Sequence, residues 1–198
     1  MYAKLLIATG NPGKLRELCE LLAGIPFALI SPKEAGIKSR ALEDGLTYEE
    51  NAIIKARFLA NQSKMLTLAD DSGLEVDALG GEPGIKSARF GGDGISDAER
   101  NVLLLERLKD VPLEQRTARF KCVIAIASPL GRIETCQGVC EGVIAFEPAG
   151  SENFGYDPIF YFPSLGKTMA ELPVDIKNQI SHRGKATAKA KNLLDSFR

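Results

Sequence analysis

The residues of this chain best suited to chemistry are two adjacent aspartates, Asp70 and Asp71, which follow a short apolar run and precede Ser72 and Gly73. Carboxylates just beyond the end of a strand suit a hard cation such as Mg2+, which takes one or two protein carboxylates together with substrate phosphate oxygens. The same residues also form a good turn, because Asp, Ser and Gly favour turns. We therefore predict a magnesium site at a strand end, with a polar turn as the alternative.

A candidate phosphate site lies near the start of the chain, in Thr9-Gly10-Asn11-Pro12-Gly13-Lys14. A glycine-containing turn before a helix offers backbone N–H groups and a positive dipole end to an anion, and Lys14 adds a point charge. The segment is not a P-loop, because the spacing is too short and Leu15, not Ser or Thr, follows the lysine. An ordinary strand-to-helix turn is the alternative.

Two later segments could contact a nucleotide. In Asn153-Phe154-Gly155-Tyr156-Asp157-Pro158, two aromatic rings could stack on a base and Asp157 could accept from a ring N–H, with a loop packed on the core as the alternative. Ser181-His182-Arg183-Gly184-Lys185-Ala186 holds the single histidine, for which a cap or surface position is the alternative. Arg183 suits a phosphate or the acceptor edge of a purine.

Together these segments carry the groups that a nucleoside triphosphate needs. The basic candidates are Lys14, Lys177 and Arg183, and the acidic candidates are Glu43, Asp70 and Asp71. Hydrophobic periodicity alone does not show that these residues meet in space. Binding of one nucleotide by all of them is therefore a hypothesis about the fold.

Hydrophobic patterning predicts an α/β fold that positions these segments. Short apolar runs predict strands at residues 4–9, 27–30 and 66–69, and longer runs predict a hairpin of residues 118–127 and 133–146. Helices are predicted from about Lys14, after Thr47, after Ser96, and over residues 185–197. Thr47 with Glu50 and Ser96 with Glu99 have the spacing of capping boxes.

Composition narrows the class of protein. A length of 198 residues with 44% hydrophobic and 26% charged residues suits a single domain over residues 1–198. The formal net charge of -1 gives no bulk positive field for duplex nucleic acid, so a nucleic-acid-binding protein is disfavoured. The apolar run near the N-terminus is too short for a signal peptide or a membrane span, so we expect a cytoplasmic protein. Without a CxxC pair, the cysteines at 19, 122, 136 and 140 are expected to be buried free thiols.

At these residues the sequence resembles the inosine triphosphate pyrophosphatase family, the noncanonical purine NTP pyrophosphatases. The motifs, in chain order, are TGNPGK at residues 9–14, ENAIIKA from Glu50, ADDSGLEVDALGGEPGIKSARF at 69–90, FGYDPIF at 154–160 and SHRGKA at 181–186. They follow one another over almost the whole chain. One departure is Glu152-Asn153, which replaces the glycine-rich lead-in expected before FGYD.

The resemblance implies a fold, a reaction and a role for each site residue. The fold would be a long twisted mixed sheet flanked by helices, with two lobes and a central active-site cleft, in a homodimer. The reaction would be Mg2+-dependent hydrolysis of ITP, dITP and XTP to the monophosphate and pyrophosphate, which keeps these nucleotides out of DNA and RNA. Residues 9–14 would bind the triphosphate, Asp71 would be base and metal ligand, and Glu43 the other metal ligand. The remaining substrate contacts would be Ser72, Phe154, Gly155, Tyr156, Asp157, Lys177, His182 and Arg183.

The mechanism that we expect has water attacking the α-phosphorus, with a carboxylate taking its proton. Asp71 is the predicted base and Asp70 the competing choice, while Lys14 and Lys177 would stabilise phosphate charge. Donors aimed at the purine O6 would disfavour adenine, because an unpaired buried donor costs about 1–3 kcal/mol. Two alternatives stay open, a pyrophosphatase for modified pyrimidine nucleotides and a nucleotide sensor without activity.

Overall fold

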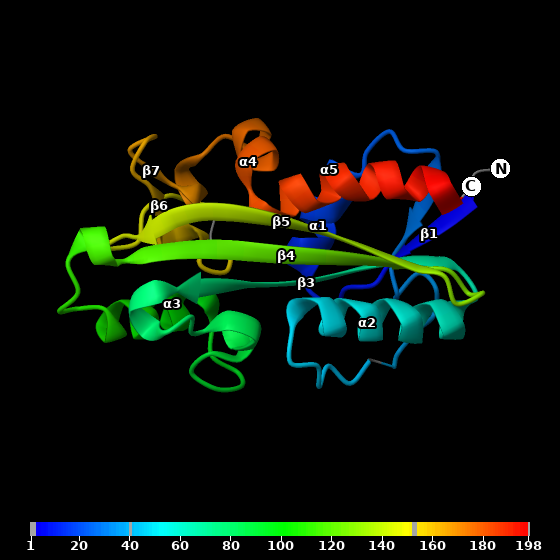
Figure 1. Cartoon of the computed structure of the whole chain (residues 1–198), viewed down its shortest axis with the longest axis horizontal. Helices are drawn as coiled ribbons and strands as arrows, with labels where there is room; N and C mark the ends of the chain where they lie inside the picture. The colour runs from blue at the N-terminus through cyan, green and yellow to red at the C-terminus, as the bar shows by residue number, and fades with distance from the viewer. Residues whose placement is uncertain (1–2, 40, 152–153, 198) are drawn as a thin grey trace. The chain divides into compact units, whose positions relative to one another are not determined.

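The computed structural model describes residues 3–39, 41–151 and 154–197, and its strands form a seven-stranded sheet in the order β2-β1-β3-β4-β5-β6-β7 (Figure 1). The strands are β1 (Ala3–Ile7), β2 (Phe27–Ile30), β3 (Leu66–Val76), β4 (Thr117–Ala127), β5 (Ile133–Ile144), β6 (Phe160–Phe162) and β7 (Lys167–Thr168). β1 pairs in parallel with β2 and β3, whereas β6 pairs antiparallel with β5 and β7. The sheet is therefore mixed and flanked by helices, as predicted.

The chain divides into two compact units. Unit 1 comprises Met1–Asp71, Cys122–Gly138 and His182–Arg198, and unit 2 comprises Ser72–Lys121 and Val139–Ser181. The helices are α1 (Pro12–Leu21), α2 (Tyr48–Ser63), α3 (Asp97–Arg107), α4 (Val174–Ile180) and α5 (His182–Leu194). By these bounds, α1, α2 and α5 belong to unit 1, and α3 and α4 belong to unit 2.

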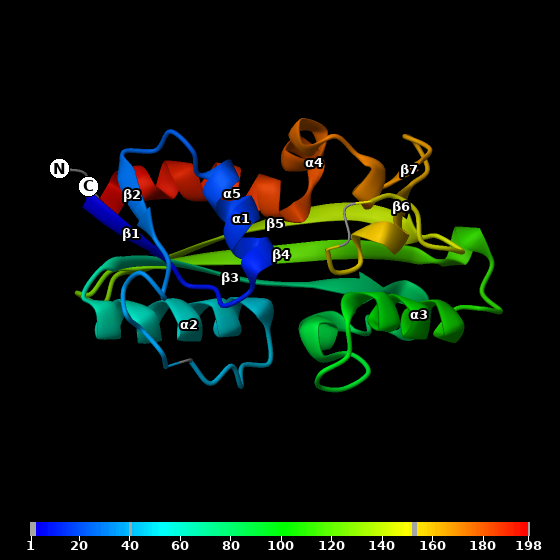
Figure 2. The ribbon, with the colours of Figure 1, turned by 180° about the vertical axis from the view of Figure 1, so that it is seen from behind.

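In unit 1, α1 and α5 cover one face of the sheet and α2 covers the other (Figure 1, Figure 2). The core between the sheet and helices α1 and α5 contains Leu18 of α1 and Ala190 of α5, packed with Leu68 of β3 and Ile124 of β4. Small residues of α5 such as Ala186 let the helix approach the sheet closely, because they add little side-chain volume. This packing places the first turns of α1 and α5 next to β3.

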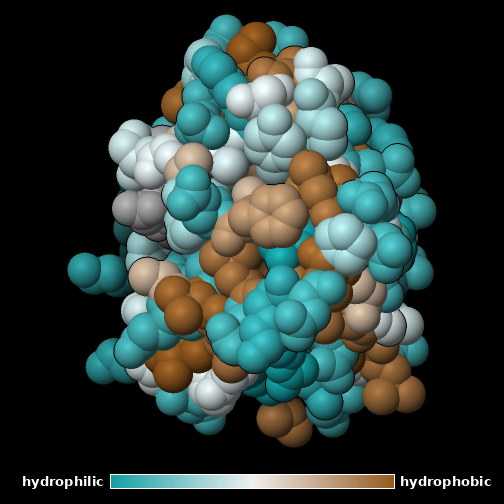
Figure 3. All heavy atoms as spheres, turned by 90° about the vertical axis from the view of Figure 1, so that its left-hand side faces the viewer, coloured by the Kyte–Doolittle hydropathy of each residue, from teal (hydrophilic) through white to brown (hydrophobic). Residues whose placement is uncertain are grey.

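In unit 2, α3 and α4 lie on opposite faces of the sheet (Figure 1). The core contains Leu104 of α3, Tyr156 and Phe160, with the rings of Phe120 and Phe160 at 4.6 Å between centroids. Figure 3 shows hydrophobic residues interspersed with hydrophilic ones on the side of the molecule that faces left in Figure 1. Surface apolar side chains scattered in this way are usual for folded proteins.

Local capping explains where the helices begin. The Asn11 side chain accepts from the amides of Gly13 and Lys14 at the start of α1, and the predicted capping box of Ser96 and Glu99 opens α3. At α2, Thr47 accepts from the Glu50 amide, but the Glu50 carboxylate accepts from the Leu46 amide at 2.6 Å. The second predicted box is therefore only half formed, because Glu50 binds the preceding loop.

Two predicted boundaries next to the site residues are wrong. The strand expected at residues 66–69 continues to Val76, so Asp70 and Asp71 lie inside β3 and neither at its end nor in a turn. α5 begins at His182, three residues before the predicted start at Lys185. In both places charged residues continue a regular element, because their partners come from distant parts of the chain.

Two class predictions can be compared with the described residues. Within the described ranges, no helix is both long and apolar enough to cross a membrane. All four cysteines lie among the described residues and are free thiols, with Cys122 and Cys140 buried but Cys19 and Cys136 only partly buried.

Candidate functional site

The two aspartates of β3 point to opposite faces of the sheet, because side chains alternate along a strand. The Asp70 side chain is 0% exposed and meets residues of α1 and α5. The Asp71 side chain is 13% exposed and lies on the side of Lys55 in α2. Of these two aspartates, only Asp71 therefore has a carboxylate that solvent reaches.

On the Asp70 face, charges of alternating sign form a chain. Lys14 Nζ lies 3.1 Å and Arg183 Nη2 3.4 Å from Asp70 Oδ2. The other terminal nitrogen of Arg183 donates to the Glu17 carboxylate in a short hydrogen bond. Buried charges need such pairing, because removing them from water is costly. The network thus fixes Lys14 and Arg183 against the strand.

On the Asp71 face, the Lys55 ammonium meets three oxygens. Lys55 Nζ lies 2.9 Å from Glu43 Oε2, 2.9 Å from the backbone oxygen of Asp70 and 3.7 Å from Asp71 Oδ1. The loop that carries Glu43 is fixed by Asn51, whose amide accepts from the Gly45 N–H at 2.9 Å and donates to the Gly45 carbonyl at 3.3 Å. The structure therefore brings Glu43 and Asp71 together around one cation.

These surroundings give the two aspartates opposite pKa shifts. Burial raises the pKa of Asp71 to about 6, with Lys55 and Lys14 opposing the rise. Burial also acts to raise the pKa of Asp70, but Lys14, Arg183 and Lys55 outweigh it and hold that pKa below its ordinary value. Asp70 is therefore a permanent charge that positions cations, whereas Asp71 can exchange a proton near neutral pH.

The predicted phosphate segment stands at the N-terminus of α1, with Gly10, Asn11 and Pro12 exposed. The Asn11 N–H donates to the Thr9 hydroxyl at 3.2 Å. The amides of Gly13 and Lys14 donate to Asn11 Oδ1 at 2.9 and 3.1 Å, so these two N–H groups already have an acceptor. Lys14 Nζ is thus the group of this segment best placed to meet a phosphate.

Unit 2 brings together a second set of predicted residues. Lys177 Nζ lies 2.7 Å from Asp157 Oδ2 and 5.9 Å from the centroid of the Phe154 ring. The buried Tyr156 donates its hydroxyl to the Ser87 carbonyl at 2.9 Å. Ser72 is half-buried on β3, and the departure at Glu152-Asn153 lies outside the described residues. Phe154, Asp157 and Lys177 therefore form one aromatic and charged group.

The histidine lies at the first position of α5 and is buried, so the surface alternative for His182 is wrong. α5 can begin here because Gly138 of β5 has no side chain. A Cβ at Gly138 would overlap the His182 carbonyl oxygen and lie 2.6 Å from the Ala186 amide nitrogen. This close approach sets the position of Arg183 relative to β3.

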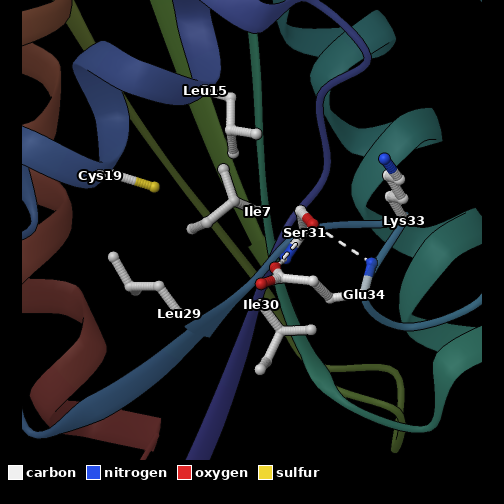
Figure 4. A pocket seen from close by; sticks show the side chains of 8 residues that line it. All are labelled: Ile7, Leu15, Cys19, Leu29, Ile30, Ser31, Lys33 and Glu34. Carbon is white, nitrogen blue, oxygen red and sulfur yellow. Dashed lines mark hydrogen bonds between the residues drawn. The ribbon is translucent and has the colours of Figure 1, made fainter.

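A cavity of about 520 Å³ lies beside α1 in unit 1 (Figure 4). Figure 4 shows the side chains of Ile7, Leu15, Cys19 and Leu29 converging, with Ser31 and Glu34 hydrogen-bonded at one side. Its lining is largely apolar, and it contains none of the predicted site residues. This cavity is therefore separate from the charged group around β3.

The atoms that contact Lys55 Nζ are all oxygens, and oxygens are the ligands that Mg2+ prefers. Within the described ranges there is no group of three or more His, Cys, Asp or Glu side chains that could bind a metal. Glu43 and Asp71 instead form a carboxylate pair, and a lysine ammonium already occupies a position between them. This donor set fits a cation that also takes ligands from a substrate.

Lys55 and Glu17 had no predicted role. Lys55 lies on α2 between the buried Ala52 and Ala56, and a charged residue beside a buried face is a signal that sequence analysis could have used. Glu17 contacts Arg183 across 166 residues of sequence, for which the sequence offers no signal.

Comparisons with known proteins give one family. A sequence model of the Ham1 family matches residues 5–193. The chain is 52% identical over 192 residues to a dITP/XTP pyrophosphatase from Desulforamulus reducens, covering 97% of this chain and 96% of that protein. It is 49% identical over 191 residues to a dITP/XTP pyrophosphatase from Geobacter sulfurreducens, covering 96% of each. A solved HAM1 protein from Coxiella burnetii superposes with a TM-score of 0.88 at 43% identity, covering 98% of this chain and 99% of that one.

Proposed function

The chain belongs to the Ham1 family, and we propose that it hydrolyses noncanonical purine nucleoside triphosphates, ITP, dITP and XTP, to the monophosphate and pyrophosphate. Relatives that are about half identical over nearly the whole chain bear the name dITP/XTP pyrophosphatase. The observation that carries the proposal is the contrast between Asp70, buried and charged, and Asp71, accessible with a raised pKa. Such a pair separates a structural charge from a base.

Asp71 is the proposed base that takes a proton from the attacking water. In the metal-free protein the pKa of Asp71 is raised to about 6, so its carboxylate is mostly ionised at neutral pH and still accepts a proton, as suits a general base. Asp70 serves poorly in this role, because its side chain is not exposed and its ion pairs with Lys14 and Arg183 stabilise its charge. Its proposed role is to position Lys14 and Arg183.

Glu43 and Asp71 are the proposed ligands of Mg2+, and Lys55 marks the place where their oxygens converge. When bound, Mg2+ supplies charge neutralisation for phosphate oxygens. Asn51 holds the Gly45 peptide and so keeps the Glu43 loop in place. Lys14, which is partly exposed, is placed to bind a phosphate group of the substrate.

The proposed base-binding residues are Phe154 and Asp157, with Lys177 fixing both. A half-buried ring suits stacking on a purine, and a carboxylate suits a ring N–H. Arg183 in this structure is engaged by Glu17 and Asp70, which supports a role in positioning Asp70. The predicted contacts of Arg183, His182, Ser72 and residues 9–13 with substrate stay predictions, as does the central cleft.

The test is the release of pyrophosphate by purified protein with Mg2+ from ITP, XTP, dITP, ATP and GTP. Fast release from the first three, slow release from ATP and GTP, and loss of release in Asp71→Asn are expected. Asp110→Asn, an exposed carboxylate, is the matched control and should keep full activity. Binding of ITP without turnover would favour a sensor, and preference for a modified pyrimidine nucleotide would favour the related enzyme class.

We propose a homodimer in the cytoplasm, on the resemblance to the family alone. Sedimentation velocity of the purified protein at micromolar concentration tests the dimer. A single species with the mass of the 21.4 kDa chain would contradict it.

A further inference from the structure

Gly155 belongs to the proposed base-binding segment, residues 154–157, and side chains of α3 contact both its N–H and its carbonyl. The Gly155 N–H donates to Asp97 Oδ2 at 2.8 Å. The Gly155 carbonyl accepts from Asn101 Nδ2 at 3.1 Å. Asp97 and Asn101 are four residues apart on α3, so their side chains lie on the same side of the helix. Side chains of one helix, α3, thus hydrogen-bond to both the N–H and the carbonyl of Gly155.

These two contacts orient two peptide planes. The N–H belongs to the peptide that joins Phe154 to Gly155, and the carbonyl belongs to the peptide that joins Gly155 to Tyr156. Gly155 has a φ of +58°, a left-handed conformation that residues with a Cβ adopt at a cost of about 1–2 kcal/mol. With both planes fixed, the directions in which Phe154 and Tyr156 leave the glycine are fixed as well.

Each of the two α3 side chains is itself held in place. Asp97 Oδ1 accepts from Arg100 at 2.6 Å, and Arg100 also donates to the carbonyls of Phe90 and Ile95. Asn101 is 3% exposed. Asp97 is thus held by its ion pair with Arg100, although its side chain is 42% exposed, and Asn101 is held by burial. A residue that positions another needs such support.

Stability alone does not explain the choice of asparagine at this position. Asn101 Oδ1 is buried and has no hydrogen-bond partner among the residues that the structure describes. A buried acceptor in that state disfavours folding, and an apolar side chain of the same size would avoid the penalty. What the carboxamide contributes is the N–H that reaches Gly155.

We propose that Asp97 and Asn101 are positioning residues that set base selectivity, by fixing Gly155 and through it the Phe154 ring and the Asp157 carboxylate. The inference rests on the proposed function, because Phe154 and Asp157 are its base-binding residues. On the other side of the segment, the contact of Lys177 with Asp157 at 2.7 Å completes the support. Loss of an α3 contact leaves the ring and the carboxylate present but less well oriented.

Two near-isosteric variants test this. Asn101→Leu removes the unpaired acceptor Oδ1 but also leaves the Gly155 carbonyl without its donor, so the two effects offset and the midpoint of urea unfolding should change little. Asp97→Asn leaves one oxygen for Arg100 and turns an amide N–H toward the Gly155 N–H. In both, the ratio of kcat/KM for ITP to that for ATP is expected to fall about tenfold, mainly through a higher KM for ITP. Asn192→Leu, at an exposed position of α5, is the control and should keep the wild-type ratio.

Amide hydrogen exchange of the nucleotide-free protein gives a readout that needs no activity. The Gly155 amide should exchange about tenfold faster in Asp97→Asn than in the wild type, because it loses its acceptor. Faster exchange with an unchanged selectivity ratio would overturn the proposal, and so would unchanged exchange or an equal loss of activity on ITP and ATP. Failure of the proposed function itself shows in the wild type, as absence of pyrophosphate release from ITP before any variant is made.

Discussion

Replacing the adjacent aspartates of β3 one at a time is expected to change the stability of the metal-free protein in opposite directions. Asp71→Asn should stabilise the protein at pH 8, and Asp70→Asn should destabilise it. Asn is nearly isosteric with Asp, so both variants change charge more than packing. The difference arises because burial dominates at Asp71, whereas three cations outweigh burial at Asp70.

The magnitude for Asp71 follows from its pKa. A rise from about 3.9 in the unfolded chain to about 6 in the folded protein corresponds to about 2–3 kcal/mol, because each pH unit is worth 1.36 kcal/mol. The sign is fixed by proton binding, since between pH 4 and 6 the folded state keeps a proton that the unfolded state has lost. Stability from this group therefore falls as pH rises from 4 to 6 and stays low above it.

The magnitude for Asp70 follows from its ion pairs. Its carboxylate is 0% exposed and lies 3.1 Å from Lys14 and 3.4 Å from Arg183. Removing one partner of a buried ion pair costs about 3–5 kcal/mol, because the remaining charges stay in a poorly solvated place. The depressed pKa means that this contribution is present above about pH 4 and is lost as pH falls below it.

The assay is urea unfolding in EDTA at pH 5 and pH 8, with Asp110→Asn as the exposed control. At pH 8 the order of stability should be Asp71→Asn, wild type, then Asp70→Asn. The gain of Asp71→Asn over the wild type should shrink at pH 5. A less stable Asp71→Asn, or an Asp70→Asn equal to the wild type, would refute the reasoning.

Three further substitutions test other contacts. Lys55→Met removes the ammonium beside Asp71, so the acidic limb of the kcat/KM profile should move to higher pH; an unmoved limb between pH 5 and 9 would contradict this. Gly138→Ala crowds the backbone of α5 and should lower the free energy of unfolding by about 1–3 kcal/mol. Gly10→Ala is the control and should leave stability nearly unchanged, because a Cβ at Gly10 meets no described atom within 4 Å. Lys177→Met removes the cation 2.7 Å from Asp157 and should raise KM for ITP about tenfold. Lys167→Met, at an exposed position, is the control and should leave KM for ITP unchanged. Equal KM values in the two variants would refute the role of the contact between Lys177 and Asp157.

Much of the fold could be predicted from local signals. Apolar runs gave β2 at residues 27–30 and the hairpin strands to within two residues, because buried strands read as continuous hydrophobic segments. The predicted β3 is too short, because Asp and Gly are unfavourable in strands. Their place in β3 depends on Lys14 and Lys55, whose contacts with Asp70 and Asp71 no local pattern contains.

The candidate site was predictable as a set of motifs and not as a geometry. The sequence indicated Glu43, Asp70, Asp71 and Lys14 by residue type, and the structure brings these four together. It could not indicate which aspartate is buried, because that depends on which face of β3 receives α1 and α5. The partners of Arg183 lie 113 and 166 residues away in sequence, so its engagement by Asp70 and Glu17 could come only from the tertiary structure.

The most direct test of the central claim is hydrolysis of ITP by the wild-type protein in 18O-labelled water, with mass analysis of both products. Attack of water at the α-phosphorus places the label in IMP and leaves pyrophosphate unlabelled, which is the predicted result. Label in pyrophosphate would mean attack at the β-phosphorus, and release of labelled inorganic phosphate with IDP would mean attack at the γ-phosphorus. Either of these outcomes would contradict the account.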